Sequence, residues 1–245
     1  MTDWRRDVLA YWFGLDPKQW WRSGPEVDEE IRERFSKLWT EKRQLPVDAF
    51  LEDSLTALAA VVLFDQFPRN MCRDSAEQFA TDHLALAIAR SAVDRGFDDN
   101  LQPQERGFLY MPFQHSENLA DQNRSVQLFT ALGDDYQLGF AKKHHDVVER
   151  FGRFPHRNAI LGRAPRPAEV AAGDVVPWRM SLVELARFDN RVEAELARLN
   201  LEAEGIDAIL FDADMHSFGW GPIVPIRLMV LEEDLADARR LLPEL

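Results

Sequence analysis

The chain has 245 residues, of which 46% are apolar and 11% aromatic, enough to bury one large core or two smaller ones. Its 42 acidic and 29 basic side chains give a net charge of −13, which argues against nucleic acid or an anionic membrane surface as the main partner. The sequence has no apolar run of about 18 residues and no apolar core of a signal peptide, so we expect a cytoplasmic protein. Its single cysteine, Cys72, cannot form an internal disulfide.

Apolar residues recur at helical spacing from residue 3 to about residue 163, and no strand is expected there. The first helix is expected to end at Gly14, and a second to begin after Ser23 and Pro25. The most apolar helix should run over 49–66 and stop by Phe67, because Pro68 disfavours helical geometry in the residue before it. Further helices are expected over 76–95, over 117–132 with Ser116 as N-cap, and from 134 to about 150.

The pattern changes after a stretch rich in Pro, Gly and Ala at 163–177. Strands are expected at 182–186, 206–211 and 226–230, and helices at 190–204 and 233–242. This β-α-β-β-α order predicts a small α+β domain with helices on one face of an antiparallel sheet. We therefore expect a mainly α protein with a helical domain at 1–165, a linker at 166–178 and the small domain at 179–245.

A motif of two phenylalanines, proline, arginine and asparagine occurs twice, as FDQFPRN at Phe64–Asn70 and as FGRFPHRN at Phe151–Asn158. Around the second motif, residues 142–166 hold seven basic and two acidic side chains, a local charge of +5 in an acidic protein. Such a concentration attracts anions, and arginine suits two-point contact with carboxylate or phosphate. The predicted binding residues are Asp65, Arg69, Asn70, Arg150, Arg153, Arg157 and Asn158. The candidates for acid–base catalysis are His115, Glu117, His144 and His156.

A purely structural role for these motifs is the alternative. Their phenylalanines could anchor helix ends, with Arg and Asn bonded to the last carbonyls. Asp65 could pair with Arg157, or Arg69 with Glu117, as buried salt bridges. We interpret His83 as a core or boundary residue, His216 as a solvated loop residue and Cys72 as a packed thiol.

Searches for nucleotide-binding, zinc-protease, CxxC and nucleophile-elbow motifs find none, so no cofactor is expected. His144 and His145 are adjacent on a predicted helix, where neighbouring side chains point about 100° apart. No metal site is expected either.

Five sequence stretches carry a resemblance to a known bacterial family, domain of unknown function 924. They are Tyr11–Gly14, Phe64–Asn70, Phe79–Asp82, Met111–Glu117 and Phe151–Asn158. The resemblance covers about residues 5–165 and implies a tetratricopeptide-like, all-helical fold with no established activity. The family's histidine before the second motif corresponds to His144. The sequence departs from the family's usual tail at Ala164–Glu169.

Residues of about 180–243 resemble a small family of PII-like, ferredoxin-like prokaryotic proteins to which signal transduction is ascribed. The matching stretches are Leu185–Asn190 with Glu193–Glu195, Leu201–Ile206, and Arg227–Asp234 with Ala238–Arg239. Residues 177–245 carry seven arginines against fourteen acidic residues, a net charge of −7. We expect this acidic domain to be regulatory.

The leading functional hypothesis is a ligand- or protein-binding helical module whose anion-binding groove takes an acidic peptide, an acidic protein or a small anion. The alternative is a hydrolase-like enzyme that acts on a small anionic substrate, with histidine as acid or base and arginine as clamp. A third hypothesis is that the acidic domain occupies the basic segment and regulates it.

Overall fold

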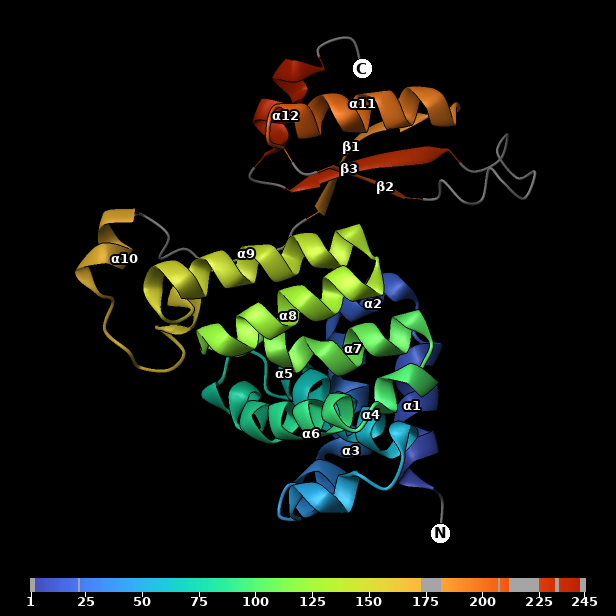
Figure 1. Ribbon diagram of the computed structural model, residues 1–245, viewed down its shortest axis with the longest axis vertical. Helices are drawn as coiled ribbons and strands as arrows, with labels where there is room; N and C mark the ends of the chain where they lie inside the picture. Colours follow the sequence, from blue (N-terminus) through green and yellow to red (C-terminus); the bar gives the residue numbers. More distant parts are fainter. Residues whose placement is uncertain are drawn as a thin grey trace. The chain divides into compact units, whose positions relative to one another are not determined.

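The computed structural model describes residues 3–21, 23–172, 182–206, 208–211, 225–231 and 234–242 (Figure 1). The chain divides into two compact units, residues 1–177 and residues 178–245. The predicted class is confirmed: a mainly helical unit is followed by a small α+β unit in the order β-α-β-β-α.

The helical unit contains ten α-helices within the described residues. They are α1 (Trp4–Gly14), α2 (Pro17–Trp21), α3 (Pro25–Lys42), α4 (Ser54–Val61), α5 (Phe67–Met71), α6 (Asp82–Asp94), α7 (Pro103–Gln114), α8 (Leu119–Leu132), α9 (Asp135–Phe151) and α10 (Pro167–Ala172). Short 3-10 turns connect them: η1 (Val47–Phe50), η3 (Ala76–Phe79), η4 (Phe97–Asn100) and η5 (Pro155–Arg157). A π turn, η2 (Val62–Gln66), lies between α4 and α5.

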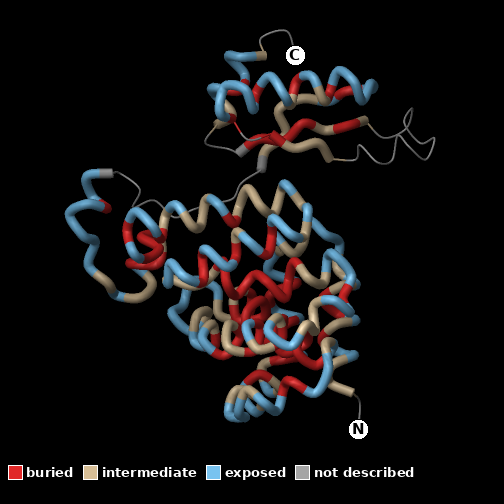
Figure 2. Tube along the Cα trace, in the orientation of Figure 1, coloured by how far each residue is buried: buried red, intermediate tan, exposed pale blue. Residues whose placement is uncertain are grey.

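The core of this unit is built around α4 and η2. Every side chain from Ala57 to Phe64 is fully buried, as expected for a helix that is apolar on all sides. Helices α1, α6 and α7 pack against α4. Figure 2 shows the buried residues concentrated in the middle of the helical unit.

The prediction that the helix ends before Pro68 is wrong. The chain continues from α4 through η2 into α5, and the Phe67 N–H bonds to the Val62 carbonyl in the wider π-helical pattern. Pro68 has no N–H for the Phe64 carbonyl, which accepts a hydrogen bond from the Thr81 hydroxyl at 2.6 Å instead. Asp65 and Arg69 therefore lie on one continuous helical segment.

The start of α8 also differs from the prediction. Asn118, not Ser116, is the N-cap, and its side chain accepts from the Ala120 N–H at 2.8 Å. Glu117 consequently lies in the loop between α7 and α8. Its carboxylate is directed toward the second motif.

The small unit is a three-stranded antiparallel sheet in the order β1-β3-β2, formed by β1 (Leu182–Phe188), β2 (Ala208–Phe211) and β3 (Ile226–Leu231). The residues of the central strand that are fully buried alternate: they are Ile226, Leu228 and Val230. These pack with α11 (Arg191–Ala203) and α12 (Leu235–Leu241), which lie on one face of the sheet (Figure 1). His216 lies outside the described residues.

The stretch predicted as a linker contains α10, and Glu169 of this helix is fully buried. None of the described helices is long and apolar enough to span a membrane.

Candidate functional site

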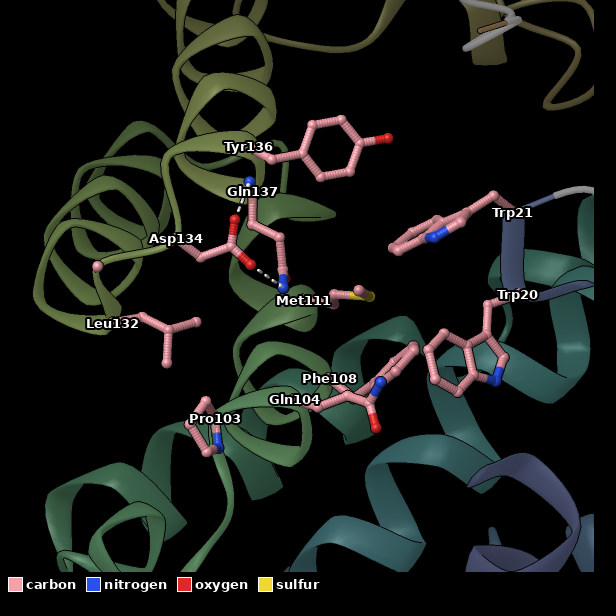
Figure 3. Close-up of a pocket in the computed structure, with 11 residues that line it drawn as sticks. Trp20, Trp21, Pro103, Gln104, Phe108, Met111, Leu132, Asp134, Tyr136 and Gln137 are labelled. Carbon is pink, nitrogen blue, oxygen red and sulfur yellow. Dashed lines mark hydrogen bonds between the residues drawn. The ribbon is translucent and has the colours of Figure 1, made fainter. Parts of the chain in front are cut away.

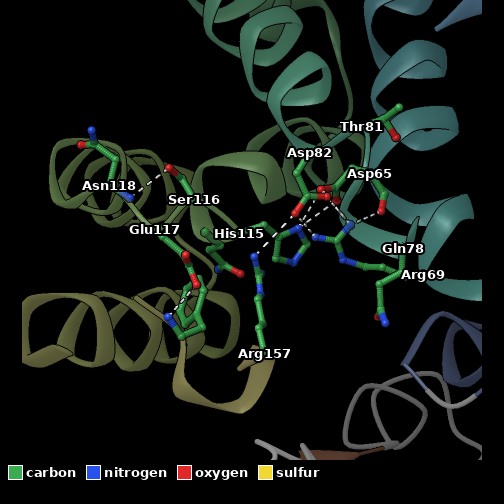
Figure 4. Close-up of polar contacts among 12 residues, drawn as sticks. Asp65, Arg69, Gln78, Thr81, Asp82, His115, Ser116, Glu117, Asn118 and Arg157 are labelled. Atoms are coloured by element: carbon green, nitrogen blue, oxygen red, sulfur yellow. Dashed lines mark hydrogen bonds and ion pairs between the residues drawn. The ribbon is translucent and has the colours of Figure 1, made fainter. Parts of the chain in front are cut away.

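Five charged or titratable side chains from five segments of the helical unit meet at one place, which we call the Arg157 cluster (Figure 4). Asp65 lies on η2, Arg69 on α5, Asp82 at the first position of α6, His115 at the C-cap of α7 and Arg157 at the end of η5. The two motifs therefore come together, although 87 positions separate their first residues.

Asp65 and His115 form a dyad in the cluster. The His115 Nδ1 lies 2.8 and 3.0 Å from the two carboxylate oxygens of Asp65, whose side chain is fully buried. Burial alone would raise the pKa of Asp65, but the Arg69 charge and the His115 contact outweigh it and lower that pKa to about 2. Burial and the nearby Arg69 lower the pKa of His115. A neutral His115 thus donates Nδ1–H to an ionised Asp65 and presents the lone pair of Nε2.

Arg69 is held by carboxylates on two sides. Its guanidinium donates to both oxygens of Asp82, at 3.0 and 3.1 Å, and lies 3.3 Å from Asp65 Oδ1. Burial would lower the pKa of Arg69, but the charges of Asp65 and Asp82 raise it overall. Arg69 therefore has its hydrogen-bonding partners within the protein.

Arg157 has different surroundings. It is only 7% exposed, and its Cζ lies 4.6 Å from the ring centroids of both Phe79 and Phe154. The nearest carboxylate oxygen, of Asp82, is 3.6 Å away, which is too far for a hydrogen bond. The guanidinium forms no hydrogen bond with the described residues, and its Nε is fully buried. Burial, and then the Arg69 charge, lower the pKa of Arg157 to about 10.

Two more histidines stand beside the cluster. The His144 ring lies 6.4 Å from that of His115 and 5.5 Å from that of Phe154, and its Nδ1 donates to the Phe140 carbonyl at 2.8 Å. Burial lowers the pKa of His144 to about 3 and, with the Arg157 charge, the pKa of His156 to about 4. Both imidazoles are therefore neutral near pH 7.

Glu117 contributes to structure rather than to an open site. Its carboxylate accepts from the Phe154 N–H at 2.8 Å and pairs with Arg163 at 2.6 and 2.9 Å. The pKa of Glu117 is lowered because these donors outweigh the effect of burial. These bonds fix the turn that carries Phe154 next to Arg157.

The remaining predicted binding residues lie outside the Arg157 cluster. Arg153 and Asn158 both bond to the buried carboxylate of Glu169, at 2.8 and 3.0 Å, and so hold α10. Asn70 donates to Ser23 and Asp28 in a separate network. Arg150 is exposed, with its Cζ 4.8 Å from the Phe151 ring centroid.

Neither of the two salt bridges that a purely structural role suggested is present. Asp65 pairs with Arg69 and His115 instead of Arg157, and Glu117 pairs with Arg163 instead of Arg69. Sequence reasoning also missed Asp82 and Phe79 as cluster residues. Their signal was present, because both belong to the stretch Phe79–Asp82 that carries the family resemblance.

Among the described residues, one group of potential metal ligands lies on α9. One trio, His145, Asp146 and Glu149 of α9, has donor atoms within 4.8 Å of one another. His145 already contacts Asn123 at 3.0 Å, and both acidic residues are exposed. The trio lies apart from the Arg157 cluster, since His144 and His145 point in different directions from the helix.

The Arg157 cluster offers a distinct chemistry. It combines a buried cation without hydrogen-bond acceptors, a neutral histidine oriented by a carboxylate, and two further neutral imidazoles. Such groups can bind a small anion, and His115 Nε2 can accept a proton from a bound molecule or water.

Comparisons with known proteins agree with this division of the chain. The family described as "Bacterial protein of unknown function (DUF924)" matches residues 8–172, and the family described as "Putative prokaryotic signal transducing protein" matches residues 182–245. The solved structure of ATU0120, a protein of unknown function from Agrobacterium tumefaciens, is 38% identical, with a TM-score of 0.65. The match covers 69% of this chain and 96% of that one. No curated protein matches the chain.

Proposed function

The chain belongs to the bacterial family of unknown function described as DUF924, and we propose that its helical unit binds a small anion at Arg157. The supporting observation is that this guanidinium is 7% exposed yet forms no hydrogen bond with the described residues. A buried charge without hydrogen bonds is costly, so a ligand that supplies acceptor oxygens would be bound favourably. Carboxylate and phosphate groups match the planar donor array of arginine.

The other charges of the cluster favour an anion over a cation. The Asp82 carboxylate is bonded at both oxygens to Arg69, so it only partly neutralises Arg157. Asp65 is likewise engaged by Arg69 and His115. The ligand is therefore a small anion, or a carboxylate or phosphate group carried by a peptide.

Isothermal titration with inorganic phosphate and with acetate tests this function. Arg157→Met should weaken binding of the preferred anion about tenfold to hundredfold, because a charge-assisted hydrogen bond contributes about 1.5–3 kcal/mol. Arg150→Met removes the same charge from an exposed position in the same basic segment and should change the affinity less than about twofold. Equal affinities for the two variants would refute the site.

A second function, acid–base catalysis on the bound anion, is favoured by the Asp65–His115 dyad. The carboxylate fixes Nδ1–H of His115 at 2.8 Å, so Nε2 is the nitrogen that can take a proton. A neutral imidazole is ready to act as a base near pH 7. The substrate would be an ester or amide carrying a carboxylate or phosphate group.

A screen of small carboxylate- and phosphate-bearing esters and amides tests the catalytic proposal. His115→Gln should lower kcat by about 10²–10⁴-fold while phosphate or acetate still binds. His145→Gln, whose ring contacts Asn123 outside the Arg157 cluster, should leave kcat unchanged. Absence of turnover throughout the screen, or turnover that survives in His115→Gln, would count against catalysis but not against anion binding.

The small unit is proposed to regulate this site. Its support is the charge of −7 in residues 177–245, opposite to the +5 of residues 142–166. A negatively charged domain attached to an anion site competes electrostatically with the ligand.

A further inference from the structure

A cavity of the helical unit, lined by none of the Arg157 cluster residues, lies where α2, the first turns of α7 and the turn between α8 and α9 meet (Figure 3). Its volume is about 490 Å³, within the range of about 300–1,000 Å³ typical of small-molecule sites. Its principal walls are the side chains of Trp20, Trp21, Phe108, Met111 and Tyr136. No part of the proposed anion site lines it.

The inner wall of this cavity is tightly packed against the core. Phe108 and Met111 are 2% and 5% exposed. The Trp20 ring meets Phe108 edge-on at 5.1 Å, and its Nε1 donates to the Trp12 carbonyl at 2.7 Å. Both rings are thus fixed by the core, so a ligand would meet a preformed surface.

The outer wall is an exposed indole. Trp21 is 44% exposed, and its ring is nearly parallel to that of Phe108, with centroids 6.3 Å apart and planes inclined by 13°. Within the described residues, Trp21 Nε1 forms no hydrogen bond. The exposed indole of Trp21 therefore offers a stacking surface, next to the buried Phe108 ring, that the protein itself does not use.

The polar lining is sparse. Besides the Tyr136 hydroxyl and the indole N–H groups, it consists of Gln104, Asp134 and Gln137, of which only Asp134 is acidic. The Asp134 carboxylate caps α9 through Gln137 N–H and Gln137 Nε2, both at 3.0 Å (Figure 3). This carboxylate disfavours a negatively charged ligand and leaves lone pairs for an N–H or O–H donor.

We propose that this cavity binds a flat, uncharged aromatic compound of one or two rings that stacks on the exposed indole of Trp21. This proposal goes beyond anion binding and does not depend on it. A structural link between the two sites exists, because Gln66 Nε2 contacts both Met111 Sδ and the Asp65 carboxylate.

Saturation-transfer NMR with indole as the probe tests the proposal on the full chain. Gln104→Trp, at an exposed position that lines the cavity, should fill it and weaken indole binding at least tenfold. Gln127→Trp is the matched control: it is exposed on α8 outside the cavity and should bind indole like the wild type. Trp21→Ala should also weaken binding about tenfold through loss of stacking.

Cyclohexanol serves as a second probe that separates stacking from filling of an apolar space. It should bind at least tenfold more weakly than indole. Absence of saturation transfer from indole to the wild type would overturn the proposal. So would equal indole binding by the two glutamine variants, or equal binding of indole and cyclohexanol.

Discussion

Arg153 and Arg157 belong to the same motif, but their surroundings are different. Arg153 is bonded to the buried Glu169 carboxylate and to the Ala164 carbonyl at 2.8 Å each. Arg157 lies against two phenylalanine rings without a hydrogen-bond acceptor among the described residues. The first is positioned to stabilise the fold, and the second is the residue at which we propose that an anion binds.

Unfolding measurements can separate these two roles. Arg157→Met keeps the size of the side chain and removes a buried charge, so the free energy of unfolding should stay the same or rise by up to about 3 kcal/mol. Asp82 keeps Arg69 as its partner, so no carboxylate is left unpaired. Arg153→Met removes the ion-pair partner of the buried Glu169 carboxylate, so it should lower the free energy of unfolding. Chemical denaturation measures both values. A loss of stability in Arg157→Met comparable to that in Arg153→Met would assign Arg157 a structural role.

The buried histidines predict a pH dependence of stability. The pKa values of about 3 for His144 and about 4 for His156 lie below the ordinary value of 6.5, so the unfolded chain binds more protons than the folded one between these values. Stability is fully present above pH 6.5 and should fall as the pH drops toward 4, by at most about 2 kcal/mol per histidine between pH 6.5 and 5. Denaturation curves across this range measure the slope.

A matched pair of variants assigns that slope. His156→Gln should make it shallower, whereas His83→Gln, at an exposed position of α6, should leave it unchanged. The carboxylates of Asp65 and Glu169, with pKa values of about 2, lose their contribution only as the pH falls below about 4. An unchanged slope in His156→Gln would show that its imidazole is not held neutral by the fold.

Sequence reasoning at this scale identified the residue types but not their partners. Asp65, His115 and Arg157 were all candidates, and the structure brings them together. The sequence could not distinguish Arg153 from Arg157, because the difference depends on where α10 places Glu169. Asp82 was missed because the sequence predicted one helix over 76–95 with Asp82 inside it, whereas α6 begins at Asp82 in the structure.

At the scale of elements, the path of the chain through Pro68 decides the geometry of the site. A helix interrupted there would separate Asp65 from Arg69. The π turn η2 keeps them on one segment, and Thr81 supplies the hydrogen bond that proline cannot. The Thr81 hydroxyl also accepts from Trp39 Nε1 at 3.1 Å, so one side chain satisfies two buried groups.

Thr81→Val tests this role. It preserves the shape of the side chain but leaves the Phe64 carbonyl and Trp39 Nε1 without partners, which should lower the free energy of unfolding by about 2–4 kcal/mol. Thr130→Val is the control, because its exposed hydroxyl bonds to the Val126 carbonyl within α8 and its loss should cost less than about 0.5 kcal/mol. Equal stabilities of the two variants would mean that another donor satisfies the Phe64 carbonyl.

The elements that the sequence predicted well are those with an unambiguous local signal. Gly14 ends α1, and the alternating apolar residues of β3 form the buried strand of the small sheet. The prediction was wrong where two local signals compete. Proline at position 68 favours a helix end, but burial of all sides of α4 and η2 favours continuation, and burial prevails. Ser116 and Asn118 are both good caps, and the hydrogen bond of Ser116 to Asp121 leaves Asn118 to begin α8.

At the scale of the whole molecule, charge is distributed unequally between the two units. All residues of the Arg157 cluster lie within residues 1–177, while residues 177–245 carry a net charge of −7. Because electrostatic interactions between exposed charges extend only about 8–10 Å at physiological salt, the regulation that we propose for the small unit should depend on ionic strength.

Removal of residues 178–245 should therefore raise the affinity of the helical unit for phosphate or acetate a few-fold at low salt, where screening is weak. Titrations of the full chain and of residues 1–177, each at low and at high salt, measure the difference. Arg157→Met in the shortened chain is the control, and it should bind no better than the same variant of the full chain. A purely electrostatic effect should vanish at high salt, whereas an increase that persists there would mean that the small unit covers the site. Equal affinities at every salt concentration would exclude regulation of this site by the small unit.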